Sequence, residues 1–283
     1  MPRRAARWLA EPALGQVVRA FGFGESLDPE QLAAWSAAVL DTRQGHERRE
    51  APPVDWDTTR VKAVVEAAGQ LGLMVTDWPA LSAYTTTVIL GGAATGNRLR
   101  TQLVRDLQAR GVDVGTVVLL ASNRPISPSE HATDPESADD TSEWMHLLRC
   151  VDDFFGPLEP TVEASKREAS DIWRDDTFTG AAGTAVRLVV AEDRVTRRPT
   201  TLAAVRFLMN RSDAAALSPV LVVTSAIYVP YQFFAAVPAF LSGGVRPVEV
   251  IGTPTSIADE RLLAQRLGQE LHAAITWAVR LIA

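Results

Sequence analysis

Five short apolar segments recur along the chain, and small, polar or charged residues follow them. The segments are residues 87–90, 116–120, 186–190, 220–223 and 248–251. Stretches with helical apolar spacing separate them, for example Leu99, Leu103 and Leu107, so we expect helical crossovers between parallel strands. The pattern predicts an α/β fold, with a Rossmann-like parallel sheet of about five strands.

The first 84 residues have a helical pattern without such strands. Asp28 followed by Pro29 is typical of a helix start, and Val61, Val64 and Ala68 recur on one face of another helix. Because two or three helices bury little apolar surface alone, we expect them to lie on the sheet as a layer. The predicted domains are an N-terminal helical layer, residues 1–84, and a Rossmann-like α/β domain, residues 85–283, which ends in a helix with a long apolar stripe.

The residues after the predicted strands are the candidate site, because open α/β sheets bind ligands outside the carboxyl ends of their strands. Residues 91–98, GGAATGNR, connect the first strand to a helix, whose N-terminus favours an anion. The stretch lacks the Lys and Ser or Thr of a Walker A loop, and it is not G-x-G-x-x-G. The candidates here are Gly91, Gly92, Asn97 and Arg98; the alternative is that glycine is needed for packing alone.

Other strand ends supply further candidates. Ser122 and Asn123 follow the second strand. After the third strand, Glu192 is expected to hold a ribose or sugar hydroxyl, and Arg198 with Thr200 to meet a phosphate or carboxylate. The alternative is that Thr200 caps a helix and the arginines are surface charges.

The fourth strand leads into TSAIYVPY, residues 224–231. The hydroxyl groups of Thr224 and Ser225 would orient a polar ligand, and Tyr228 would stack against a ring. Buried packing tyrosines are the alternative. No G-x-S-x-G elbow surrounds Ser225, so a serine nucleophile is not predicted.

Residues 123–140 carry three prolines and five acidic residues. Two interpretations remain open for this segment: a mobile loop over the site or a solvated linker. Its histidine and acidic residues match no established metal-ligand spacing, so we predict no metal site.

Charge and composition exclude some partners. The formal net charge is −6 and no basic stripe stands out, which argues against nucleic acid. No stretch approaches 18 apolar residues, which argues against a membrane span. The single cysteine, Cys150, allows no internal disulfide and lies among apolar residues, so we expect a cytoplasmic protein. The partner expected from the strand-end residues is a small-molecule ligand.

The order of these elements resembles the YdcF-like family of bacterial domains, which includes SanA and ElyC. The similar parts, between residue 86 and the C-terminus, are the strand with glycines at 88–92, Arg98, Glu192, the threonines at 200 and 201, the strand at 221–225 and Gln269-Glu270-Leu271. The chain has Tyr228 and Tyr231 where the family commonly has a histidine and an arginine. The resemblance implies a Rossmann-like fold and a strand-end pocket for a nucleotide-like or other anionic ligand, but no particular reaction.

The sequence thus leads to one main hypothesis and two alternatives. The main hypothesis is a Rossmann-like protein that binds a small anionic or nucleotide-like ligand, with an adenosyl compound as one candidate, in the manner of an enzyme of specialised metabolism. The first alternative is a noncatalytic ligand-sensing or interaction protein. The second is a hydrolase of a phosphorylated or glycosidic substrate, with Glu192 or Asp193 as general base.

Overall fold

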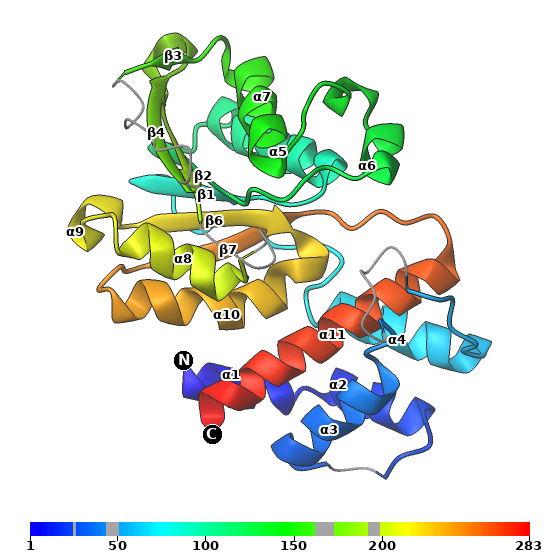
Figure 1. Cartoon of the computed structure of the whole chain (residues 1–283). Coiled ribbons are helices and arrows are strands. Elements are labelled where there is room, and N and C mark those ends of the chain that lie inside the picture. The colour runs from blue at the N-terminus through cyan, green and yellow to red at the C-terminus, as the bar shows by residue number, and fades with distance from the viewer. Residues whose placement is uncertain (25–26, 44–50, 162–172, 192–198) are drawn as a thin grey trace. The chain divides into compact units, whose positions relative to one another are not determined.

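The computed structural model describes residues 1–24, 27–43, 51–161, 173–191 and 199–283 (Figure 1). They form two compact units. The α/β unit comprises Asp77–Ser225 and Ala236–Thr253, and the helical unit comprises Met1–Thr76, Ala226–Ala235 and Pro254–Ala283. The chain therefore passes twice from the helical unit into the α/β unit and back.

The sheet of the α/β unit contains the five predicted strands, all parallel, and the Rossmann-like α/β prediction is confirmed. In chain order its strands are β1 (Thr86–Leu90), β2 (Thr116–Ala121), β3 (Glu159–Pro160), β4 (Arg174–Thr179), β5 (Ala185–Val190), β6 (Val220–Ser225) and β7 (Val248–Thr253). The order across the sheet is β3-β4-β5-β2-β1-β6-β7, and β3 and β4 add an antiparallel edge that was not predicted. The strand count is therefore seven in the described residues.

Both faces of the sheet are covered by helices, as an internal parallel sheet requires. On one face, Ile89 and Leu119 belong to a core shared with α5 (Ala94–Ala109) and α7 (Glu143–Phe155). On the other face, Val88 and Leu120 belong to a core shared with α8 (Thr201–Met209) and the second half of α10 (Val229–Ser242). The strands are short apolar runs because both of their faces are buried.

Short elements complete the α/β unit: α6 (Pro128–Thr133), η1 (Pro135–Ser137), η2 (Ala181–Gly183) and α9 (Ala214–Leu217). Two of them, α6 and η1, lie in the acidic segment 123–140. Glu130, Asp134 and Ser137 of that segment are buried. The segment is therefore not a solvated linker, which was one of its two interpretations.

The helical unit contains α1 (Pro2–Leu9), α2 (Pro12–Ala20), α3 (Pro29–Val39), α4 (Thr58–Gln70), η3 (Ala226–Tyr228) and α11 (Glu260–Ile282). Asp28 forms the predicted cap, since its Oδ1 accepts from Gln31 N–H at 2.8 Å. Leu263, Leu267 and Leu271 of α11 are buried in one core with residues of α2, α3 and α4. These units differ from the predicted domains 1–84 and 85–283, because the apolar stripe of α11 packs on the N-terminal helices.

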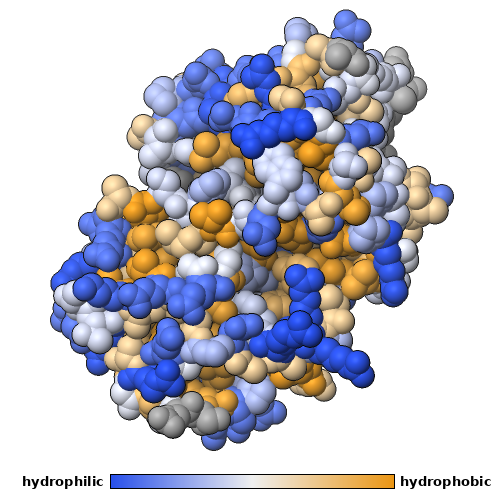
Figure 2. All heavy atoms as spheres, turned by 180° about the vertical axis from the view of Figure 1, so that it is seen from behind, coloured by the Kyte–Doolittle hydropathy of each residue, from blue (hydrophilic) through white to orange (hydrophobic). Residues whose placement is uncertain are grey.

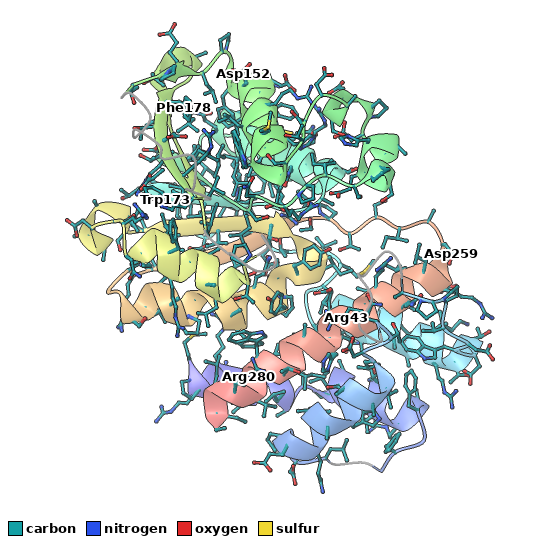
Figure 3. All side chains as sticks on the ribbon, viewed as in Figure 1. Arg43, Asp152, Trp173, Phe178, Asp259 and Arg280 are labelled. Atoms are coloured by element: carbon teal, nitrogen blue, oxygen red, sulfur yellow. The ribbon has the colours of Figure 1, made fainter. Side chains whose placement is uncertain are left out.

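Hydrophobic and hydrophilic residues alternate over the face of the molecule in Figure 2. Side chains fill the space between the sheet and its helices in the α/β unit (Figure 3). No helix within the described part of the chain has both the length and the apolar character that crossing a lipid bilayer requires.

Candidate functional site

The candidate site lies where the parallel strands end in the α/β unit. β1 is paired on one side with β2 and on the other with β6. The helix after β1 covers one face of the sheet, whereas the helix half that precedes β7 covers the other. The ends of β1 and β6 therefore flank the switch point at which open α/β sheets bind ligands.

Gly91 and Gly92 make room for two charged side chains. A Cβ atom on Gly91 would lie 2.3 Å from Glu143 Oε1, and one on Gly92 would lie 2.7 Å from Arg100 Nη1. The N–H of Gly92 donates to Asn97 Oδ1 at 2.8 Å. The glycines therefore have a packing role at this turn, and Asn97 holds the turn itself.

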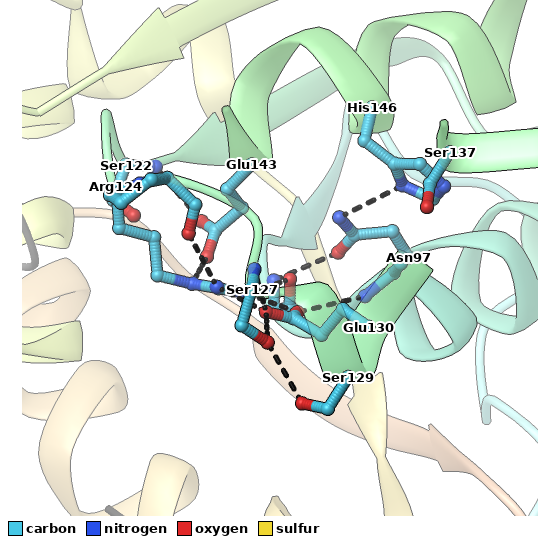
Figure 4. A network of polar contacts seen from close by, with 12 residues as sticks. Asn97, Ser122, Arg124, Ser127, Ser129, Glu130, Ser137, Glu143 and His146 are labelled. Carbon is cyan, nitrogen blue, oxygen red and sulfur yellow. Dashed lines mark hydrogen bonds and ion pairs between the residues drawn. The ribbon is translucent and has the colours of Figure 1, made fainter. Parts of the chain in front are cut away.

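The N-terminus of α5, predicted to bind an anion, holds a carboxylate of the protein. Glu130 Oε1 accepts from Ala94 N–H at 3.2 Å and from Arg124 Nη2 at 2.8 Å. Glu130 Oε2 accepts from Arg124 Nη1 at 2.9 Å and from the backbone N–H and hydroxyl of Ser127 at 3.1 and 3.0 Å. Figure 4 shows this network. Five hydrogen bonds thus fix an acidic group where an anionic ligand was expected.

Arg124 is the centre of the network. Besides its two bonds to Glu130, it donates through Nε to Glu143 Oε2 at 2.7 Å and through Nη2 to the carbonyl oxygen of Gly92 at 2.8 Å. Glu143 Oε1 accepts from Ser122 N–H at 2.9 Å. One guanidinium group therefore ties the turn after β1, the end of β2 and the first residue of α7 together.

These contacts keep Glu130 ionised. Burial opposes ionisation of Glu130, but hydrogen bonds from Arg124 and Ser127 outweigh it and lower its pKa from 4.5 to about 2. Burial lowers the pKa of Arg124, but the carboxylates of Glu130 and Glu143 outweigh it and raise that pKa. At neutral pH, Glu130 is thus a hydrogen-bond acceptor and not a proton donor.

Arg98 lies in an acidic cluster on α5 and the segment that follows β2. Its guanidinium pairs with Asp134 at 3.4 Å, with Asp153 at 3.5 Å and with Glu136. Sequence reasoning placed Arg98 beside a ligand anion. The structure places it beside three carboxylates of the protein, where it holds η1 against α5 and α7.

A buried histidine lies next to this cluster. His146 Nε2 is 3.3 Å from Asp134 Oδ2, and its Nδ1 is 3.4 Å from Asn97 Nδ2. Burial lowers the pKa of His146, so the neutral ring donates to Asp134 and accepts from Asn97. Burial also raises the pKa of the Cys150 thiol to about 12, which agrees with a core residue rather than a nucleophile.

The end of β6 presents one hydroxyl to each face of the sheet. Ser225 Oγ accepts from Arg100 Nε at 3.3 Å and from Nη2 at 3.2 Å, and Arg100 also donates to the carbonyl oxygen of Leu90. Thr224 follows Val222 on the opposite face, where its buried hydroxyl has no partner in the described structure. The buried Ser122 hydroxyl, at the end of β2, also has none there. Arg100 thus bridges β1 and β6 at the switch point.

The remaining candidates have other roles in the structure or lie outside its described residues. Glu192 and Arg198 lie outside the described residues. Thr200 caps α8, as its Oγ1 accepts from Ala203 N–H at 3.2 Å. Tyr228 belongs to the helical unit and packs against its apolar core.

Sequence reasoning missed Arg100, Arg124, Glu130 and Glu143. Two sequence signals were available. Ser127 and Glu130 have the S-x-x-E spacing of a helix start, and Ser142-Glu143 opens the next apolar helix. Such signals locate helix starts, but they do not predict that both carboxylates converge on one arginine.

Three uncharacterized proteins, from Mycobacterium bovis and from two strains of Mycobacterium tuberculosis, are similar to this chain. Each is 28% identical over an alignment of 211 residues that covers 71% of this chain and 58% of the relative. The chain thus matches little more than half the length of these relatives. No family model and no solved structure matches it.

Proposed function

We propose that the α/β unit binds a small anionic or nucleotide-like ligand, such as an adenosyl compound carrying a phosphate or carboxylate, at the ends of β1, β2 and β6. The observation that carries this proposal is the internal carboxylate of Glu130 at the N-terminus of α5. A backbone N–H, a helix N-terminus and a bidentate guanidinium are the donors that bind phosphates and carboxylates in proteins. The acidic group of the ligand takes the place of Glu130.

Neighbouring groups suit the rest of such a ligand. The hydroxyl groups of Ser122 and Thr224 are buried and have no partner within the described chain. Buried polar groups are normally hydrogen-bonded, so a polar ligand at the strand ends would satisfy them. Ser225, held by Arg100, borders the same ends.

A noncatalytic binding protein is the second candidate, and the state of the titratable groups favours it over an enzyme. Glu130 is held ionised by Arg124, the Cys150 thiol is held protonated, and His146 is fully buried. None of these three is poised to exchange a proton with a ligand near neutral pH. Glu192, the predicted base of the hydrolase alternative, lies outside the described residues.

The variant Glu130→Gln tests the proposal with adenosine 5′-monophosphate as the probe. Gln keeps the shape of the side chain but lacks the charge, so it competes less well for Arg124. We expect calorimetric titration to show about tenfold tighter binding than in the parent, since a charged hydrogen bond contributes roughly 1.4 kcal/mol more than a neutral one. Glu136→Gln is the matched control, because Glu136 pairs with Arg98 and does not contact α5 N–H groups. Equal affinity in parent and Glu130→Gln, or no binding by either, would contradict the proposal.

A further inference from the structure

The N-terminus of α7 lacks the side-chain cap that several other helices have, and two N–H groups of its first turn have no acceptor in the described residues. Ser142 is the N-cap residue, but its side chain makes no capping bond. Asp28, Asp57 and Asp259, by contrast, each accept from the first turn of their helices. The N–H groups of Trp144 and Met145 find no acceptor in the described part of the chain. The first turn of α7 therefore retains unsatisfied donors.

The hydroxyl of Ser142 is a second, independent sign of a missing partner. Ser142 is only 6% exposed, and its Oγ has no hydrogen-bond partner among the described residues. A Ser hydroxyl at an N-cap normally accepts from the first turn, and a buried hydroxyl without a partner is rare. A ligand oxygen bound there would satisfy the hydroxyl and the two N–H groups together.

A cavity of about 270 Å³ lies at these donors. It is lined by Asn123, Pro125, Thr141, Ser142, Trp144 and Met145. Asn123 Oδ1 accepts from Trp144 Nε1 at 3.2 Å. This bond fixes the orientation of the Asn123 side-chain amide, whose Nδ2 can then donate to a ligand. No carboxylate lines this cavity, and Glu143 turns its own toward Ser122 and Arg124.

We infer that this cavity is an oxyanion site of phosphate size, in which Ser142, Asn123 and the N–H groups of Trp144 and Met145 donate to one phosphate group. The dipole of α7 favours a negative charge at this end, and the Arg174 guanidinium lies 4.0 Å from the centre of the Trp144 ring. Unlike the N-terminus of α5, this site needs no displacement of a protein carboxylate. This phosphate site is additional to the proposed function, and its binding of phosphate does not depend on displacement of Glu130.

An adjoining cavity indicates the class of ligand. About 310 Å³ of space continues along α7 and shares Trp144 and Met145 with the first cavity. Its lining combines the apolar Leu148, Leu158 and Phe178 with the charged Asp140, Arg149 and Asp152, and Figure 3 labels Phe178 on β4 and Asp152 on α7. The pair of cavities therefore fits a phosphate monoester whose phosphate lies at α7 and whose body carries both apolar and polar groups.

Titration with inorganic phosphate at constant ionic strength tests the site, followed by the amide signals of 15N-labelled protein. We expect saturable shifts of the Trp144 and Met145 amides. Ser142→Ala, which removes one donor, is expected to weaken phosphate binding about tenfold. Asn123→Asp keeps the acceptor for Trp144 Nε1 but adds a negative charge, and is expected to weaken it more. Gln102→Glu adds the same charge on the exposed side of α5 and should bind as the parent does.

Two results would overturn the inference. One is that the NMR signals of the Trp144 and Met145 amides do not shift at millimolar phosphate. The other is equal binding by the parent and Asn123→Asp, with the remaining amide signals showing an intact fold. A response of the Ala94 amide instead would place phosphate at α5, which would refute this site while supporting the proposed function. The two proposals therefore fail separately.

Discussion

Replacing Arg124 with alanine is expected to lower the free energy of unfolding by about 3–5 kcal/mol, because it leaves two buried carboxylates without their partner. Glu130 and Glu143 are 4% and 5% exposed, and Arg124 bonds to both. Burying a charge without a partner costs more free energy than the ion pair contributes to stability. Chemical denaturation of the parent and variant, followed by a probe in the α/β unit, measures the difference.

Arg105→Ala is the matched control, since Arg105 is an exposed arginine of α5. We expect it to change the free energy of unfolding by no more than about 0.5 kcal/mol. Combining Arg124→Met with Glu130→Gln and Glu143→Gln removes all three charges and should restore much of the lost stability. If Arg124→Ala were as stable as Arg105→Ala, the central role of Arg124 would be wrong.

The stability that Glu130 contributes is expected to disappear in acid. Its pKa is about 2 in the folded state and 4.5 ordinarily, so the folded state favours the ionised form. The contribution is therefore fully present above about pH 5 and is lost as the pH falls through 4.5 toward 2. The shift corresponds to on the order of 3 kcal/mol, because one pKa unit is about 1.4 kcal/mol.

The measurement is the difference in free energy of unfolding between the parent and Glu130→Gln at several pH values. Other titrating groups act on both proteins and cancel in that difference. The stability of the parent relative to the variant should fall by about 3 kcal/mol between pH 6 and pH 2. A difference that stayed constant over this range would show that Glu130 is not held ionised by its partners.

The apolar pattern was sufficient to predict the parallel strands, because buried parallel strands are nearly continuous apolar runs. It missed β4, whose sequence RDDTFT is polar. This strand lies next to the short edge strand β3 and most of its residues are only half-buried, so its sequence has no apolar run. The helix α11 was predicted, yet an apolar stripe does not specify its partner. In the structure that partner is the N-terminal helical group.

Sequence reasoning located the site region but not its contacts. The strand-end rule placed Gly91, Ser122 and Ser225 at one edge of the sheet, as the pairing of β1 with β2 and β6 bears out. It did not show that Glu130 reaches the N-terminus of α5, because that direct hydrogen bond joins residues 36 apart and a third residue, Arg124, holds Glu130 in place. Charge pairing between distant segments follows from tertiary packing, which single-sequence patterns do not encode.

Titrating the 15N-labelled parent protein with adenosine 5′-monophosphate tests the central proposal most directly. Binding at the strand ends predicts saturable shifts of the amides of Gly91, Gly92, Ser122, Thr224 and Ser225, with larger shifts at equal ligand in Glu130→Gln. Amides at these positions that do not respond at millimolar ligand, or shifts confined to residues 1–76, would contradict it.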